Sequence, residues 1–134
     1  MTHQRTLTIT SVLSALFFSF HWADEIARGI ESGTFSSYGG ILILFVWLYA
    51  ALALVHRRLG LFTLLLASVL ASGVPVLHMQ GVGFIGGRIP ANSSGAFFWV
   101  WTNVALGVSG LVSLALSARA LWSLGRKPGG WKEG

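Results

Sequence analysis

Four long apolar runs constrain this chain more than any other feature of its sequence. They cover about residues 7–28, 38–55, 59–79 and 96–124. A helix needs about 20 mostly apolar residues to span a bilayer, and none of these runs alternates with the two-residue period of a transmembrane barrel. The sequence therefore predicts a single domain over residues 1–134, an all-α integral membrane protein built as an up-down bundle of four transmembrane helices, followed by a flexible basic tail at 125–134.

Composition supports the membrane interpretation and excludes several kinds of site. Of the 134 residues, 54% are hydrophobic and only 10% are charged, whereas a soluble domain has roughly 25% charged residues. The chain contains no cysteine. Disulfides, zinc–thiolate sites, iron–sulfur clusters and thiol nucleophiles are therefore excluded.

The basic residues predict the orientation of the bundle in the membrane. With four spans, one side carries seven of the nine Lys and Arg residues: Arg5, Arg57, Arg58, Arg119, Arg126, Lys127 and Lys132. Because cytoplasmic loops are enriched in Lys and Arg, both termini are expected in the cytoplasm. A bacterial inner membrane fits this pattern. The net charge of +5 is thus explained by the orientation of the chain in the lipid bilayer, and nucleic acid is not expected as a partner.

A group of ionisable residues at the outer end of the first helix stands out from the apolar sequence. The segment 20–28 holds two of the chain's four acidic residues and one of its four histidines. At helical spacing, one face of this helix collects the following polar residues: Thr10, Ser14, His21, Asp24, Glu25 and Arg28. Lipid offers such groups no partners, so this face is expected to point into the bundle.

His78 is the expected distant partner of that group, because an up-down bundle brings the end of the third helix to the same membrane face. Imidazole and carboxylate groups suit zinc, copper, iron or manganese. The sequence therefore predicts a candidate metal site whose ligands are His21, Asp24, Glu25 and His78. Two variants remain open: haem bound by His21 and His78, and a proton relay, because histidine titrates near neutral pH.

A plainer explanation competes with the site. Asp24, Glu25 and Arg28 lie where the first helix leaves the membrane, so water could solvate them there. The sequence contains no Walker phosphate loop, no G-x-S-x-G elbow and no H-E-x-x-H motif, and enzymatic activity is not favoured. We therefore expect a non-enzymatic accessory or scaffold subunit, with a metal- or haem-binding protein and a small proton-coupled transporter or channel as alternatives.

Small residues predict where the helices pack closely. Ser68 and Ser72 stand four residues apart in the third run, and Asn103, Gly107 and Gly110 share a face of the fourth. Small side chains let helix backbones approach one another. Such surfaces also leave room for a homodimer or a larger membrane complex. Four aromatic residues are expected in an outer interfacial belt: Trp22, Tyr38, Trp99 and Trp101.

Overall fold

The computed structural model describes residues 2–29, 37–80 and 95–125, and these ranges contain four α-helices and no strand. The helices are α1 (Thr2–Ala27), α2 (Ser37–Ala53), α3 (Arg58–Gln80) and α4 (Ala96–Gly125). The all-helical prediction is thus confirmed for the described part of the chain. The predicted tail beyond Gly125 lies outside it.

Three of the four helices are long and apolar enough to cross a membrane: α1, α3 and α4. Helix α2 has 17 residues, which at 1.5 Å per residue is about 25 Å and slightly less than a bilayer core of about 30 Å. Helix α1 begins earlier than its apolar run, since the polar residues from Thr2 onward continue its backbone hydrogen bonding.

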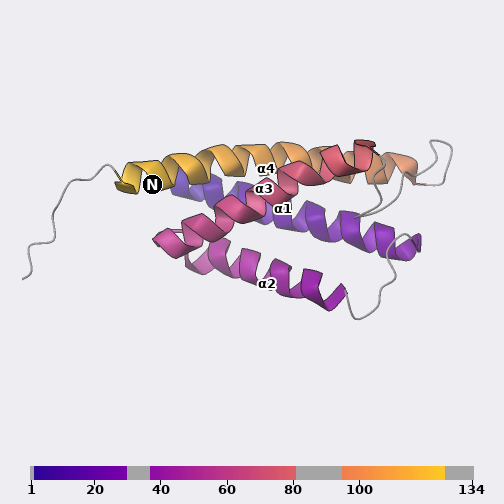
Figure 1. Cartoon of the computed structure of the whole chain (residues 1–134), viewed down its shortest axis with the longest axis horizontal. Coiled ribbons are helices and arrows are strands. Elements are labelled where there is room, and N and C mark those ends of the chain that lie inside the picture. Colours follow the sequence, from indigo (N-terminus) through magenta and orange to yellow (C-terminus); the bar gives the residue numbers. More distant parts are fainter. Residues whose placement is uncertain (1, 30–36, 81–94, 126–134) are drawn as a thin grey trace, which may run out of the picture.

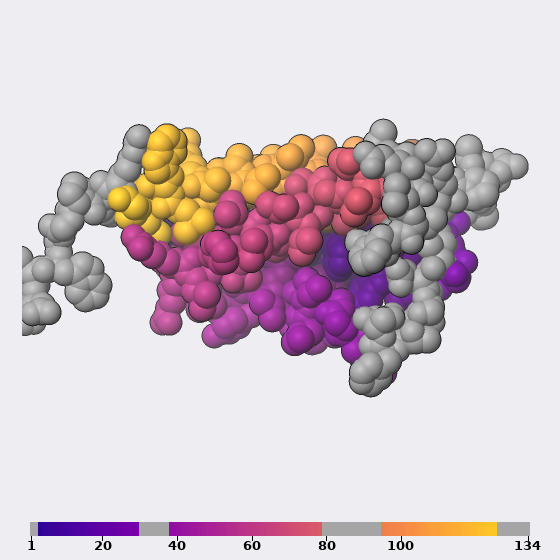
Figure 2. All heavy atoms as spheres, viewed as in Figure 1, coloured from indigo at the N-terminus to yellow at the C-terminus, as the bar shows by residue number. Residues whose placement is uncertain are grey.

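Helix α4 is the element on which the bundle is built. Helices α1 and α3 run in one direction, α2 and α4 in the other (Figure 1). Both α1 and α3 pack chiefly against α4 and touch each other little, while α2 lies against α1 and α3. Figure 2 shows the side chains of α3 lying directly against those of α4 on one face.

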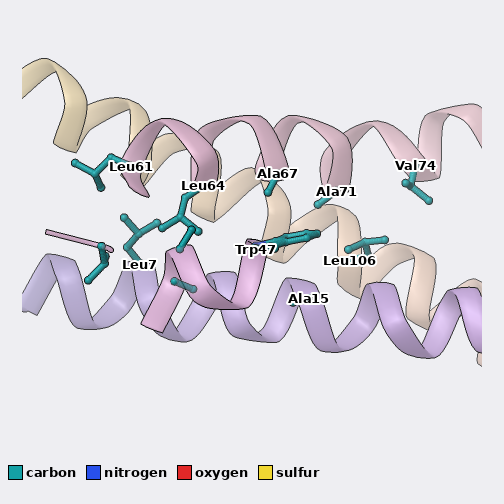
Figure 3. Close-up of a cluster of buried hydrophobic side chains, with 12 residues drawn as sticks. Leu7, Ala15, Trp47, Leu61, Leu64, Ala67, Ala71, Val74 and Leu106 are labelled. Carbon is teal, nitrogen blue, oxygen red and sulfur yellow. The ribbon is translucent and has the colours of Figure 1, made fainter. Parts of the chain in front are cut away.

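The apolar core lies where α2 and α3 meet α1. The Trp47 ring of α2 is 2% exposed and lies between α1 and α3, near Ala67 and Ala71 (Figure 3). The ring centroid of Phe18 is 6.1 Å from that of Trp47. The opposite side of α2 exposes Leu42 and Phe45 at 64% and 69%.

The interface between α3 and α4 depends on glycine. A Cβ added at Gly110 would lie 2.8 Å from Ala71 Cβ and 2.9 Å from the Ser72 backbone nitrogen. At Gly107 it would lie 2.8 Å from Pro75 Cγ. The backbones therefore approach to a distance that no larger residue permits.

The polar residues predicted beside these glycines behave differently. Ser68 is buried, and its hydroxyl donates to Leu64 O at 2.6 Å within α3. Ser72 likewise donates to Ser68 O at 2.9 Å. Asn103 is 5% exposed, and its Oδ1 accepts no hydrogen bond from the described residues. The hydroxyls of Ser68 and Ser72 thus donate to carbonyl oxygens within α3, and these side chains contribute to the interface by packing.

Hydroxyl pairs join α1 to α4. Ser14 donates to Ser109 Oγ at 2.9 Å, and Ser113 donates to Thr10 Oγ1 at 2.9 Å. Ser11 is fully buried and lies 3.5 Å from Ser113 Oγ. The predicted inward face of α1 did not include Ser11, whose burial shows that this face also extends to the residue next to Thr10.

Candidate metal centre

A buried polar cluster lies where the C-terminal ends of α1 and α3 meet the second turn of α4. His21 and Glu25 lie in the last two turns of α1, and His78 lies in the last turn of α3. The three residues are 2%, 1% and 1% exposed. Solvation at the membrane exit therefore does not account for these side chains.

Three ligand atoms converge in this cluster. His21 Nε2 and His78 Nε2 are 3.1 Å apart. Glu25 Oε1 lies 3.4 Å from His21 Nε2 and 3.3 Å from His78 Nε2. Among the described residues, these three form the group that could hold a metal ion, with one ligand atom from each. His21 and Glu25, one helical turn apart, come from α1, and His78 arrives from a helix that otherwise hardly touches α1.

The separations between these atoms match a small metal ion. Three atoms at 3.1, 3.3 and 3.4 Å from one another have a common centre about 1.9 Å from each, so an ion with bonds of 2.0–2.1 Å lies slightly outside their plane. Tetrahedral bonds of that length place neighbouring ligands about 3.3–3.4 Å apart. Octahedral angles would require about 2.9 Å. The tetrahedral geometry fits better.

Thr102 of α4 fixes the orientation of His21. Its Oγ1 lies 3.3 Å from His21 Nδ1, while its own hydroxyl donates to Phe98 O at 2.9 Å or Trp99 O at 3.1 Å. Since a hydroxyl has one proton, Thr102 Oγ1 is left to accept from His21 Nδ1–H. The neutral ring then presents a lone pair at Nε2, toward His78 and Glu25. Such outer partners are typical of metal-binding histidines.

Trp99 forms an aromatic wall beside both imidazoles. Its ring centroid is 5.5 Å from that of His21 and 5.2 Å from that of His78. Trp99 is half-buried against the site. The prediction of an outer belt did not include its contact with the two imidazoles. Tyr38 and Trp101 are exposed, and Trp22 is half-buried with its ring close to Gly40 of α2.

Electrostatics favour a cation at this point. The carboxyl ends of α1 and α3 converge there, and a helix carries partial negative charge at that end. Glu25 adds a carboxylate whose Oε1 accepts no hydrogen bond from the described residues. Asp24 does not contribute, because its Oδ2 pairs with Arg28 Nε at 2.7 Å. The predicted metal site thus contains three of its four residues, and Asp24 lies outside it.

Bis-imidazole haem does not fit this arrangement. An iron between two axial imidazoles needs nitrogens about 4 Å apart, twice a metal–nitrogen bond, with a porphyrin between the rings. The two Nε2 atoms are 3.1 Å apart and the ring centroids 4.8 Å. No porphyrin has room between them.

Thr102 is the contact that the sequence interpretation missed. A signal for it exists, since Thr102, Ser109, Ser113 and Ser117 follow one another at steps of seven, four and four. That spacing places their hydroxyls on one face of α4, the face that meets α1.

Neither a family model, nor a curated protein, nor a solved structure matches this chain.

Proposed function

We propose that this protein is an integral membrane protein that holds one zinc-like divalent metal ion between α1 and α3, bound by His21, Glu25 and His78. The observation that carries the proposal is the mutual separation of their ligand atoms, 3.1, 3.3 and 3.4 Å. Those values are close to the edges of a tetrahedron around an ion with bonds of 2.0–2.1 Å.

The ligand set supports zinc among the divalent metals. Two imidazoles and one carboxylate are a known zinc combination, and zinc is usually four-coordinate and tetrahedral. The other transition metals bind the same groups, so ligand chemistry alone does not select zinc. The near-tetrahedral separations of the ligand atoms favour zinc over ions that prefer octahedral or square-planar coordination, such as manganese or copper(II).

The role we propose for the ion is structural. All three ligands are at most 2% exposed, which favours a closed site over one that a substrate enters. Helices α1 and α3 touch each other little, so an ion bound by both ties together two helices that otherwise depend on α4. This role agrees with the accessory or scaffold function expected from the sequence.

The proposal places the site at the outer face of a bacterial inner membrane. Four spans with both termini in the cytoplasm put Arg5, Arg57 and Arg119 on the inner side, in agreement with the positive-inside rule. Helix α2 spans with local thinning of the bilayer, because its 17 residues are at the short end of the range.

A proton is the second candidate occupant. The Nε2 atoms at 3.1 Å are within hydrogen-bond distance, so one imidazole can donate to the other while Glu25 balances a proton gained by the pair. A small proton-coupled transporter would use this arrangement. The two candidates differ in metal content, which can be measured directly.

The test is metal analysis of the purified protein. After incubation with Zn²⁺ and removal of free metal, we expect about one zinc per chain by elemental analysis. Replacement by Co²⁺ should give the intense visible absorption of a tetrahedral cobalt site. His78→Ala and Glu25→Gln should each lower the zinc content, and His56→Ala, which removes an exposed histidine, should not.

Two results would overturn the proposal. One is a wild-type protein that stays folded and binds neither Zn²⁺ nor Co²⁺, which would leave the proton as occupant. The other is an equal loss of zinc in His56→Ala, which would mean that the metal binds at surface histidines.

A further inference from the structure

A cavity lies at the opposite end of the bundle from the histidine cluster. It opens where α1 and α3 begin and α2 and α4 end, at the end marked N in Figure 1. Its volume is about 330 Å³. Leu7, Leu61 and Leu116 supply apolar lining, and His56, Arg119 and Ser123 supply polar groups.

A single face of α4 contributes both kinds of lining. Leu116, Arg119 and Ser123 are separated by three and four residues, so they lie next to one another along the helix. Within one cavity wall, an apolar side chain is therefore followed by a guanidinium and a hydroxyl. An apolar floor below a cationic rim suits a molecule with a hydrocarbon part and an anionic part.

The charge around the cavity is unopposed among the described residues. A neighbouring cavity of about 450 Å³ shares Gln4, Val55 and His56 with the first and adds Arg5. Asp24 and Glu25, the acidic residues of the described ranges, both lie at the other end of α1. Among the described residues, an anion entering here meets cationic groups and no carboxylate.

We propose that this cavity binds an anionic phospholipid. The phosphate lies against Arg119, whose guanidinium matches phosphate oxygens in pairs, with Ser123 as a further donor. The start of an acyl chain lies along Leu7, Leu61 and Leu116. Anionic lipids are enriched in the leaflet that faces the cytoplasm, the side predicted for this end. The proposal does not depend on the metal centre.

The experiment compares lipids on the full-length protein. The protein is held in phosphatidylcholine nanodiscs or in neutral detergent and titrated with phosphatidylglycerol, and retained lipid is counted by native mass spectrometry. We expect phosphatidylglycerol to be retained about tenfold better than phosphatidylcholine, as for one localised charge contact of about 1.4 kcal/mol. Arg119→Gln should remove that preference, and Leu116→Trp should reduce retention of both lipids by filling the floor.

Arg57→Gln is the matched control. Arg57 is exposed at the same end of the bundle and does not line the cavity, so the variant removes the same charge without touching the site. It should keep the preference for phosphatidylglycerol. Helical circular dichroism establishes that each variant is folded, and Arg119→Lys, which keeps the charge, should retain part of the preference.

Two outcomes contradict the proposal. Equal loss of preference in Arg57→Gln and Arg119→Gln would mean that the lipid is attracted by general surface charge. Full competition by glycerol phosphate, which carries the headgroup chemistry without acyl chains, would mean that the cavity is a site for a soluble phosphate.

Discussion

His21 Nε2 and His78 Nε2 lie 3.1 Å apart although 57 residues separate them in the sequence. The contact joins α1 to α3, two helices that pack mainly on α4. Glu25 Oε1 lies within 3.4 Å of both nitrogens. This triangle is the most chemically specific feature of the described chain.

Zinc should stabilise the bundle, because the ion binds the folded arrangement of α1 and α3. At a free zinc concentration of one hundred times the dissociation constant, the gain is about 2.7 kcal/mol. We expect a higher thermal midpoint on adding Zn²⁺, reversed by a chelator. In His78→Ala the midpoint should not respond to zinc. If the thermal midpoint of the wild-type protein does not change on adding Zn²⁺, the proposed structural role of the ion is contradicted.

Thr102→Val should weaken metal binding by about 10- to 100-fold, the usual effect of losing an outer partner of a metal ligand. The substitution keeps the shape of Thr102 and removes the oxygen that accepts from His21 Nδ1. Zinc affinity is measured by competition with a chelating dye. Thr102→Ser, which keeps the hydroxyl, should retain most of the zinc affinity. If Thr102→Ser binds zinc weakly while its helicity is intact, packing and not the hydroxyl is what matters.

Acid should release the metal. An imidazole must be deprotonated at the ligating nitrogen, so protons compete with zinc for His21 and His78. Zinc affinity should therefore be lower at about pH 5 than at about pH 7.5. The measurement is a dye competition series at constant ionic strength. An affinity that is independent of pH over this range argues against histidine ligands.

Gly110→Ala should destabilise the protein by about 1–3 kcal/mol, the range for overpacking a close contact. The new methyl group would press on Ala71 Cβ and the Ser72 backbone. Gly73→Ala is the matched control in α3, since nothing lies within 4 Å of its added Cβ. Thermal midpoints of the two variants are compared, and equal midpoints would show that α3 and α4 pack less closely than described.

Topology can be tested with single cysteines, because the chain has none. Ala27→Cys lies at the end predicted to face outward, and Arg57→Cys lies at the end predicted to face the cytoplasm. In intact cells, a membrane-impermeant thiol reagent should label the first and not the second until the membrane is opened. The reverse pattern would overturn the orientation with both termini inside.

Much of the fold could be predicted because hydropathy acts along the sequence. Runs of apolar residues specify helices in lipid, where the backbone must satisfy its own hydrogen bonds. The boundaries of α3 and α4 therefore agree within a few residues with the predicted ones. The placement of His21 and His78 at the same end of the bundle follows from the same argument, because an up-down arrangement brings the ends of α1 and α3 together.

Helix rotation and neighbour choice could not be predicted, because they depend on contacts between residues far apart in the chain. The prediction from sequence gave Asp24 and Glu25 the same role as metal ligands. In the structure, Asp24 pairs with Arg28, and Glu25 is buried beside the two imidazoles. The approach of α4, which Gly107 and Gly110 permit, brings Thr102 to His21. The sequence by itself determined which segments become helices and at which end of the bundle their polar residues lie; only the tertiary structure decided which of those residues meet.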